Sequence, residues 1–185
     1  TFKAMLRSTN SGEMFASQSS TPNIFDYTCA GSGTASQATY DLCIEVDPAN
    51  ADIVYVGSIN TWKSTDGGVN WAAKTHWVGS NFASGDPTAN CAVSVHADHH
   101  WLQWSPHHSP ARLYLGHDGG INYTADGGAT WTQITNDLSI GQVYKIGQAS
   151  QSASAVMAGF QDNGVSATTD GTAFTTVGGG DGFDG

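Results

Sequence analysis

The stretch that decides the fold is Ser64-Thr65-Asp66-Gly67-Gly68-Val69-Asn70-Trp71. An aspartate at this position caps its own turn by accepting hydrogen bonds from the backbone that follows, and glycine supplies the left-handed conformations that a tight turn needs. The octapeptide therefore predicts a turn between two strands, with the tryptophan seating the turn on a β-sheet. One such turn is only a hairpin signal, so its recurrence decides what it means.

The same pattern returns three more times. It recurs as Thr124-Ala125-Asp126-Gly127-Gly128-Ala129-Thr130-Trp131, and in degenerate form as Thr168-Thr169-Asp170-Gly171-Thr172-Ala173-Phe174. An earlier copy, Ser8-Thr9-Asn10-Ser11-Gly12-Glu13-Met14-Phe15, has asparagine in place of aspartate. Four copies with an aromatic residue at a nearly fixed offset predict a repeat protein. The residues that we expect to have this structural role are Asn10, Asp66, Trp71, Asp126, Trp131, Asp170 and Phe174.

Two short runs of alternating or apolar residues precede each of the last three turns. Such runs are typical of β-strands, so each unit is predicted to contain four short antiparallel strands, with the turn between the third and the fourth. The intervals between the turn aspartates fit one propeller blade each, the first with a longer insertion. The runs are 42–48 and 52–57, 100–106 and 111–116, and 142–146 and 154–159.

The predicted fold is all-β: a partial β-propeller of four-stranded antiparallel blades, with about three and a half blades present. Propellers close with roughly four to eight blades, so we expect the remaining blades to come from the same or another chain. The predicted segments are the end of one blade (1–20), a blade (40–78), an inserted loop (79–95), a blade (96–136), a blade (140–177) and the start of the next (178–185).

These repeats resemble those of the Asp-box (BNR) β-propellers, a group that includes sialidases, xyloglucan-cleaving hydrolases, sortilin-type receptors and a photosystem assembly factor. More narrowly, the motifs at 96–100, 116–120, 161–164 and 179–182 resemble those of large secreted Bacteroidetes-type propeller proteins, loosely labelled glycosyl hydrolase. The resemblance implies export, often by the type IX system, and an extracellular or cell-surface location. Because this fold hosts many activities, the resemblance says more about fold than about function.

The charge balance excludes some classes of partner. The chain has 6 Lys+Arg against 16 Asp+Glu, a formal net charge of −10. A nucleic-acid-binding protein needs a basic surface to displace counterions from phosphates, so we expect no nucleic-acid partner. No run approaches the roughly 18 apolar residues of a membrane-spanning helix, so we expect no membrane insertion.

The three cysteines, Cys29, Cys43 and Cys91, follow no metal-ligand spacing. Two interpretations fit. In an exported protein, two of the cysteines could form a disulfide and the third could remain a thiol. Alternatively, all three could be reduced and buried. Cys29 is the preferred member of a disulfide because its surroundings have the composition of a loop.

Strand order predicts where the unusual polar residues meet. If the first strand of each blade runs from the top face to the bottom, the segments before first strands and between second and third strands lie at the top. In an extended stretch, His96, Asp98 and His100 would face one side and His99 the other. The residues predicted to bind a ligand at this face are His96, Asp98, His100, His117, Asp118, Asp162, Asn163 and Trp77.

Several chemistries fit this set. His96, Asp98, His117 and Asp118 could hold calcium or another divalent metal. Asp98, Asp118, Asp162 and Asp181 are candidates for the acid and base of glycoside hydrolysis. The structural alternative is that these aspartates cap turns and the histidines bond to backbone. Trp77 could stack on a sugar ring or simply anchor its loop.

Three functions remain open from the sequence. The first is an exported module that binds glycan or a surface protein through its top-face loops. The second is a glycoside hydrolase; a sialidase is disfavoured because its three-arginine clamp cannot be built from Arg7 and Arg112 alone. The third is a structural or assembly module whose ring is completed by a partner chain.

Overall fold

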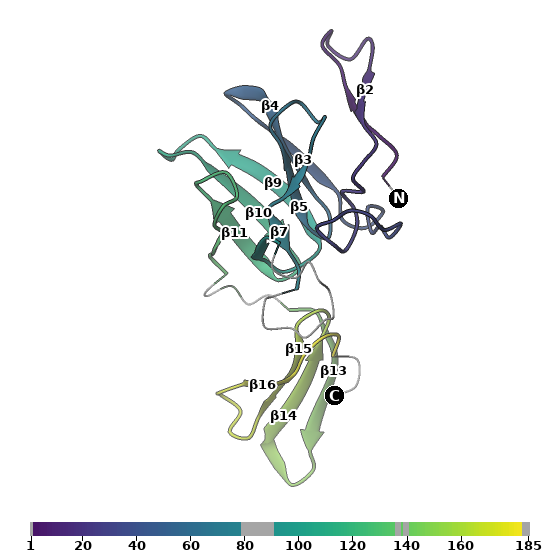
Figure 1. Cartoon of the computed structure of the whole chain (residues 1–185). Helices are drawn as coiled ribbons and strands as arrows, with labels where there is room; N and C mark the ends of the chain where they lie inside the picture. Colours follow the sequence, from purple (N-terminus) through teal and green to yellow (C-terminus); the bar gives the residue numbers. More distant parts are fainter. Residues whose placement is uncertain (1, 79–90, 136–137, 139–140, 183–185) are drawn as a thin grey trace. The chain divides into compact units, whose positions relative to one another are not determined.

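The structure is a computed structural model that describes residues 2–78, 91–135, 138 and 141–182 (Figure 1). All regular elements among these residues are β-strands, and none of the described segments forms an apolar helix long enough to cross a membrane. The chain divides into two compact units, residues 1–136 and 137–185.

The first four-stranded sheet lies in the first unit. Its strands pair antiparallel in chain order, so the sheet is a simple meander. The second half of its second strand is buried, because Val54 to Gly57 lie in the middle of the sheet and under its neighbours. The strands are β3 (Cys43–Asp47), β4 (Asn50–Gly57), β5 (Thr61–Ser64) and β6 (Ala72–Ala73).

The second four-stranded sheet repeats this meander. Burial alternates along its second strand: Leu113 and Leu115 are fully buried, and Tyr114 between them is partly exposed. This alternation is what the two-residue period of a strand requires. The strands are β9 (His99–Ser105), β10 (Arg112–His117), β11 (Gly120–Thr124) and β12 (Thr132–Gln133).

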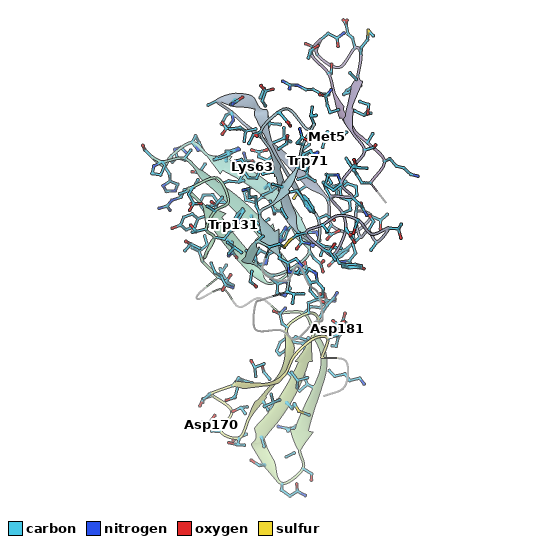
Figure 2. The ribbon with its side chains drawn as sticks, viewed as in Figure 1. Met5, Lys63, Trp71, Trp131, Asp170 and Asp181 are labelled. Atoms are coloured by element: carbon cyan, nitrogen blue, oxygen red, sulfur yellow. A yellow bond between two sulfur atoms is a disulfide. The ribbon has the colours of Figure 1, made fainter. Side chains whose placement is uncertain are left out.

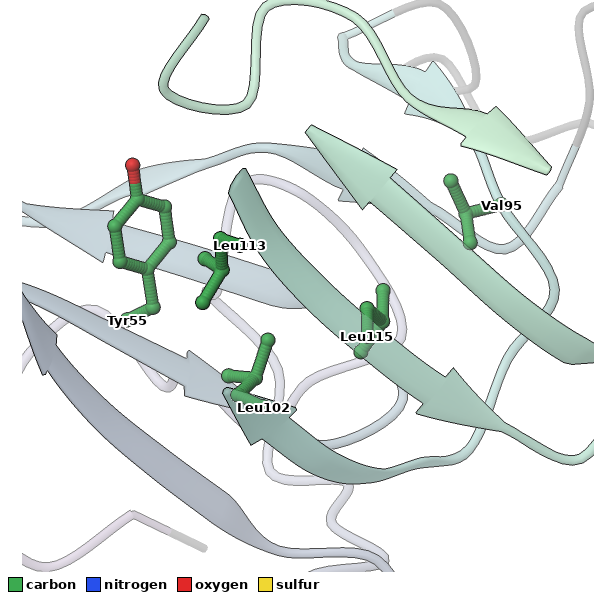
Figure 3. Packing of buried hydrophobic residues seen from close by; sticks show 5 residues of the cluster. All are labelled: Tyr55, Val95, Leu102, Leu113 and Leu115. Carbon is green, nitrogen blue, oxygen red and sulfur yellow. The ribbon is translucent and has the colours of Figure 1, made fainter. Parts of the chain in front are cut away.

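The two sheets pack against each other through their first strands. The backbone N–H of Trp104 in β9 donates to the Glu45 carboxylate of β3 at 3.2 Å, and the rings of Tyr55 and Trp104 meet edge to face. Apolar side chains from both sheets fill the space between them (Figure 3). Removing this apolar surface from water is the main force that joins the two sheets. The buried residues of this cluster are Tyr55, Val95, Leu102, Leu113 and Leu115.

Two smaller sheets complete the first unit. Strands β1 (Met5–Arg7) and β2 (Ala16–Ser19) form an antiparallel pair, and β7 (Thr75–His76) and β8 (Val93–Ser94) form a parallel pair. A second apolar cluster includes Phe2, Ile24, Val56 and Trp62, with Met5 of β1 packed against it. This cluster joins the β1–β2 pair to the first four-stranded sheet.

The second unit contains the third four-stranded sheet, again an antiparallel meander in chain order. Most of its residues are at least partly exposed, and Ala158 is its buried apolar residue. The strands are β13 (Val143–Ala149), β14 (Ser152–Phe160), β15 (Gly164–Thr168) and β16 (Thr175–Gly178).

The repeated octapeptide forms what we call the aspartate turn, which links the third and fourth strands of each sheet. In the copy centred on Asp66, the carboxylate accepts backbone N–H bonds from Val69 and Asn70 and a hydroxyl bond from Ser64. Asp126 and Asp170 repeat this geometry, and Asn10 caps the β1–β2 turn through Met14. The turn thus satisfies backbone donors that no strand pairs.

These hydrogen bonds stabilise the ionised carboxylates. The N–H and side-chain amide of Asn70 hold the pKa of Asp66 at about 2, and the hydroxyl and N–H of Thr130 do the same for Asp126. The pKa of Asp170 is also lowered, chiefly by the N–H of Ala173. A bonded carboxylate resists protonation because protonation removes acceptor strength.

The aromatic residues that end the turns differ in how they pack. Trp71 and Trp131 are labelled in Figure 2. Trp71 packs on the cluster that includes Trp62 and donates its indole N–H to the Ser19 hydroxyl and the Gly68 carbonyl. Trp131 packs on the cluster between the two sheets. Phe174, at the shortened third copy, is half exposed. Trp71 and Trp131 therefore pack against apolar clusters, whereas Phe174 is about half exposed.

Cys29 and Cys91 form a disulfide, and Cys43 is a free, partly buried thiol. This selects the interpretation of one bridge and one remaining thiol. Burial raises the pKa of the Cys43 thiol to about 12, so the thiolate is scarcely populated at neutral pH.

The molecule is all-β and is built from antiparallel four-stranded blades, as in a β-propeller, with three such blades and one two-stranded part-blade. It is a partial propeller. Most of the expected inserted loop (79–90) and the last three residues of the expected next blade (183–185) lie outside the described residues.

Candidate functional site

Two polar motifs of the first unit, residues 96–100 and 117–118, meet at one end of its four-stranded sheets. We call this the leading end: the end where β3 and β9 begin and β4 and β10 finish. The register pairs His99 with His117 across a bulge, so the segment 96–100 and the pair His117 and Asp118 lie side by side. Strand pairing therefore joins two motifs that are well separated in the sequence.

Asp118 is held by two donors. The Nε2 of His100 lies 2.7 Å from its Oδ1, and the hydroxyl of Tyr40 donates to its Oδ2 at 2.8 Å. The rings of Tyr40 and His100 meet edge to face, 4.9 Å apart. Because a carboxylate can only accept, the Nε2 of His100 carries the proton in this contact. Asp118 is thus fixed in orientation.

Asp98 lies directly beside Asp118. Its backbone adopts the left-handed region (φ 63°), which is uncommon outside glycine. Its carbonyl accepts the N–H of Asp118, and its Oδ1 accepts the side-chain amide of Gln37 at 3.0 Å. One carboxylate oxygen of each aspartate lies within 4.8 Å of the other. Burial, followed by the charge of Asp118, raises the pKa of Asp98.

Asp41 is the third carboxylate of this end, and the sequence analysis missed it. It is fully buried, and the hydroxyl of Ser58 donates to its Oδ1 at 3.2 Å. Burial and the adjacent charge of Asp98 raise the pKa of Asp41 to about 6. The repeat held a signal for it, because Asp41 precedes Pro48 by the same interval as the buried His99 precedes Pro106.

The segment before β9 is not extended, so the predicted alternation of its side chains does not occur. Asp98 interrupts it with a left-handed conformation, and β9 begins only at His99. His99 is fully buried, as an inward-facing residue would be, with Thr61 at its Nδ1 and the His96 carbonyl at its Nε2. The ring of His96 instead stacks on His117, 5.7 Å away.

His99 and His117 are neutral. Burial, followed by the charge of His117, lowers the pKa of His99 to about 3, and burial also lowers that of His117. His117 accepts the Gly119 N–H at Nδ1 and faces the Asn122 carbonyl oxygen with Nε2. Both of its ring nitrogens are therefore occupied, which leaves no lone pair for a metal as arranged here. His117 thus does not fit the predicted set of metal ligands.

Trp77 is anchored and half exposed. Its indole N–H donates to the Tyr27 carbonyl at 3.0 Å, and its ring meets the Tyr27 ring edge on. Its backbone N–H donates to Asn60, which lies two residues after Ser58, the partner of Asp41. These contacts anchor the loop, and Trp77 remains 45% exposed.

In the second unit, Asp162 and Asp181 meet each other. The Oδ1 of Asp181 accepts the backbone N–H of Asp162 at 3.0 Å, and Asp162 is in the left-handed region. Asn163 donates to the Gln161 carbonyl. These contacts form a turn at the ends of β14 and β15, as expected for residues between second and third strands.

Both arginines lie away from the leading end. Arg112 starts β10, at the opposite end from His117, and its guanidinium lies over the ring of Tyr123. Arg7 forms an ion pair with Asp52 near the start of β4. No lysine or arginine of the described residues is hydrogen-bonded to Asp41, Asp98 or Asp118. The leading end is therefore suited to a neutral or cationic ligand.

The comparisons with known proteins show no family for this chain. No protein-family profile matches the chain, and no curated protein does. A crystal structure of a GH74 enzyme from Niastella koreensis matches with 21% identity and a TM-score of 0.44, covering 95% of this chain and 26% of that one. An ancestral GH74 enzyme matches with 16% identity and a TM-score of 0.44, covering 97% and 22%.

A third solved structure, YCF48 bound to D1 peptide, matches with 14% identity and a TM-score of 0.29, covering 94% of this chain and 61% of that one. This chain spans only about a quarter of the length of the GH74 enzymes.

Proposed function

We propose that this chain is the ligand-binding part of an Asp-box β-propeller and that its leading end binds a neutral glycan. The observation that carries the proposal is the meeting of Asp98 and Asp118 with the half-exposed phenol of Tyr40. Carboxylates accept hydrogen bonds from sugar hydroxyls, and aromatic rings offer an apolar face. The absence of bonded cationic side chains among the described residues of this end argues against an anionic sugar.

The test is binding of the chain to an array of neutral and anionic glycans. We expect retention on neutral glycans, lost in Asp118→Asn and weakened in Tyr40→Phe. Asp47→Asn is the matched control, because Asp47 ends β3 at the far end and caps only the Ala49 N–H. Binding to anionic glycans alone, to a protein ligand alone, or equally by the Asp118 variant would contradict the proposal.

A second candidate function, glycoside hydrolysis, is favoured by the raised pKa values of Asp41 and Asp98 beside the well-bonded carboxylate of Asp118. A carboxyl group with a raised pKa suits the general acid of a glycosidase, which works with a second carboxylate close by. One carboxylate oxygen of Asp98 lies within 4.8 Å of one of Asp118, which is closer than the roughly 6.5–9.5 Å between the carboxyl groups of inverting enzymes. Hydrolysis here would retain configuration.

Release of reducing sugar by the purified chain would decide between binding and hydrolysis. The hydrolytic function requires turnover that Asp98→Asn and Asp118→Asn both abolish, with the first-formed anomer retained by NMR. Binding without turnover leaves the glycan-binding function standing alone.

A structural role is supported by the free edge of β1. Strands β5 and β11 hold the equivalent third position and pair on both edges, whereas β1 pairs only with β2 among the described strands. Leu6, Ile44 and Val46 are half exposed along a groove of about 460 Å³ beside this edge. The occupant that fits is a first-and-second-strand hairpin of a further blade.

This role is tested by fusing a second copy of residues 42–57, the β3–β4 hairpin, ahead of residue 1. We expect the fused hairpin to raise the melting temperature and to protect the amides of β1 from exchange. If the melting temperature and the amide exchange of β1 are both unchanged, the groove does not bind a hairpin of a further blade.

Export is supported by the Cys29–Cys91 disulfide, because disulfides persist in oxidising compartments. An extracellular or cell-surface location is therefore part of the proposal, with the type IX system as the route that the sequence resemblance implies. Fractionation of the source cells tests it: recovery of the chain in the cytoplasm with reduced Cys29 would contradict it.

A further inference from the structure

From the geometry around the Cys29–Cys91 disulfide we propose a second state of this pair: a Zn²⁺ site that Cys29, Cys91 and His76 form when the disulfide is reduced. The site lies within the first unit and does not depend on glycan binding or hydrolysis. Three observations support it: the spacing of the ligand atoms, the tautomer of His76, and the contacts that hold the ligands together without the disulfide.

The first observation is the spacing of two sulfurs and a ring nitrogen. The Sγ atoms of Cys29 and Cys91 and one ring nitrogen of His76 all lie within 4.8 Å of one another. Thiolate sulfurs lie about 2.3 Å and imidazole nitrogens about 2.0–2.1 Å from a bound Zn²⁺, so two ligand atoms of one tetrahedral ion are about 3.5–3.8 Å apart. The two sulfurs need only move apart once their bond is broken.

The second observation concerns His76, which is fully buried. Its Nδ1 lies 3.1 Å from the carbonyl oxygen of Val78. Because a carbonyl can only accept a hydrogen bond, Nδ1 carries the proton of the neutral ring and Nε2 carries the lone pair. A metal-binding histidine typically donates its other ring N–H to a carbonyl or carboxylate, which fixes the tautomer and orients the ring.

The third observation is that the Cys29 loop is tied to the His76 segment by contacts other than the disulfide. The carbonyl of Tyr27, two residues before Cys29, accepts the indole N–H of Trp77 at 3.0 Å and the side-chain amide of Asn60 at 3.1 Å. Trp77 directly follows His76. These bonds keep Cys29 close to His76 when the disulfide is reduced.

Cys91 is tied to the same place through β8. Strands β7 and β8 pair in parallel, with His76 opposite Ser94. The backbone N–H of Val95 donates to the His76 carbonyl at 3.3 Å. The spacing of the three ligands in the sequence is not that of a metal site, but strand pairing and the Tyr27 contacts bring them together.

Reaching the zinc-binding state takes a dithiol reductant. The dithiol supplies two electrons and two protons, so the S–S bond becomes two thiols and the reductant becomes a disulfide. Zn²⁺ then binds both sulfurs and displaces the two thiol protons. Because thiols persist in reducing compartments and disulfides in oxidising ones, the surroundings select the state of the pair.

The ligand set selects the ion. Two thiolates and one imidazole favour Zn²⁺ over the hard cations Ca²⁺ and Mg²⁺. Three protein ligands leave a fourth position for water. Cys91 is exposed whereas His76 is buried, so water reaches the site from the side of the sulfurs.

The test is titration of the chain with Zn²⁺ after reduction by a phosphine, which carries no thiol to compete for the ion. We expect one Zn²⁺ per reduced chain, with about two protons released, and at least about tenfold weaker binding in Cys91→Ser. Cys43→Ser is the matched control, because Cys43 lies outside this group and should leave binding unchanged. Equal binding by the oxidised chain or by Cys91→Ser, or no binding by the reduced chain, would overturn the proposal.

A second measurement needs no variant. Zn²⁺ should raise the melting temperature of the reduced chain and leave that of the oxidised chain unchanged, because only the thiol form binds the ion. It should also protect Cys29 and Cys91 from alkylation by iodoacetamide. Alkylation of both thiols at the same rate with and without Zn²⁺ would contradict the site. Glycan binding by the oxidised chain tests the proposed function separately, so the two proposals can fail independently.

Discussion

The ammonium group of Lys63 in β5 donates a hydrogen bond to the carbonyl oxygen of Gly127, 3.3 Å away in the aspartate turn of the neighbouring sheet. Lys63 also lies over the ring of Tyr55. Arg7 holds the equivalent place in β1 and lies against Gly67 of the next turn. The turns of Asp66 and Asp126 are thus each contacted by a basic residue from the third strand of the preceding sheet.

Replacing Lys63 with methionine should lower the free energy of unfolding by about 1 kcal/mol, since the bond to Gly127 is lost while most of the side-chain volume is kept. The measurement is urea denaturation. Lys3→Met is the matched control, because Lys3 is exposed and should have no effect. Equal stability of the Lys63 variant would mean that the contact contributes nothing.

Replacing Asp126 with alanine should lower the stability at pH 7 by about 1 kcal/mol, as for other residues that cap backbone donors. The folded pKa of about 2 is below that of an unfolded aspartate. Stability from this carboxylate is therefore complete above about pH 4 and is lost as the pH falls through 2.

The variant should consequently lose less stability than the native chain between pH 4 and pH 2. Asp66→Ala, in the equivalent turn, should behave in the same way. If the native chain and both variants show parallel acid unfolding curves, the turn carboxylates are not the cause of acid sensitivity.

Replacing Gly119 with alanine should lower stability by about 1–3 kcal/mol, because the added methyl group overlaps the ring of His96. The His96–His117 stack would have to open. Gly147→Ala is the control, since a methyl group there meets nothing within 4 Å. Thermal unfolding of both variants measures the difference, and equal melting temperatures would show that His96 moves freely.

Replacing Cys29 and Cys91 with serine should destabilise the chain by about 2–4 kcal/mol in urea denaturation, as expected for a disulfide that closes a long loop.

The reactivity of Cys43 gives an independent check on its burial. Its raised pKa of about 12 predicts that iodoacetamide leaves it unmodified at pH 8 in the native chain and labels it in urea. Labelling of Cys43 without denaturant would contradict the burial.

The fold could be predicted because its signal is local and repeated. The bonds around Asp66 and Asp126 lie within four residues of each aspartate, so the octapeptide alone specifies the turn. The strands before each turn could be predicted because apolar and polar residues alternate along them with a period of two.

The candidate site could be predicted only in outline. Strand order brought Asp98 near Asp118, but the left-handed conformation of Asp98 broke the extended geometry on which the predicted faces depended. His117 looked like a ligand because its hydrogen bonds to Asn122 and Gly119 cannot be read from composition. Asp41 was missed because it stands alone, without a neighbouring glycine or histidine to mark it.

The bridge from Cys29 to Cys91 encloses the whole of the first four-stranded sheet, which lies between those two residues. A protease that cuts once inside this interval produces two fragments that stay covalently joined. Single nicks in this part of the chain are therefore expected to be silent on a non-reducing gel and visible only after a thiol is added.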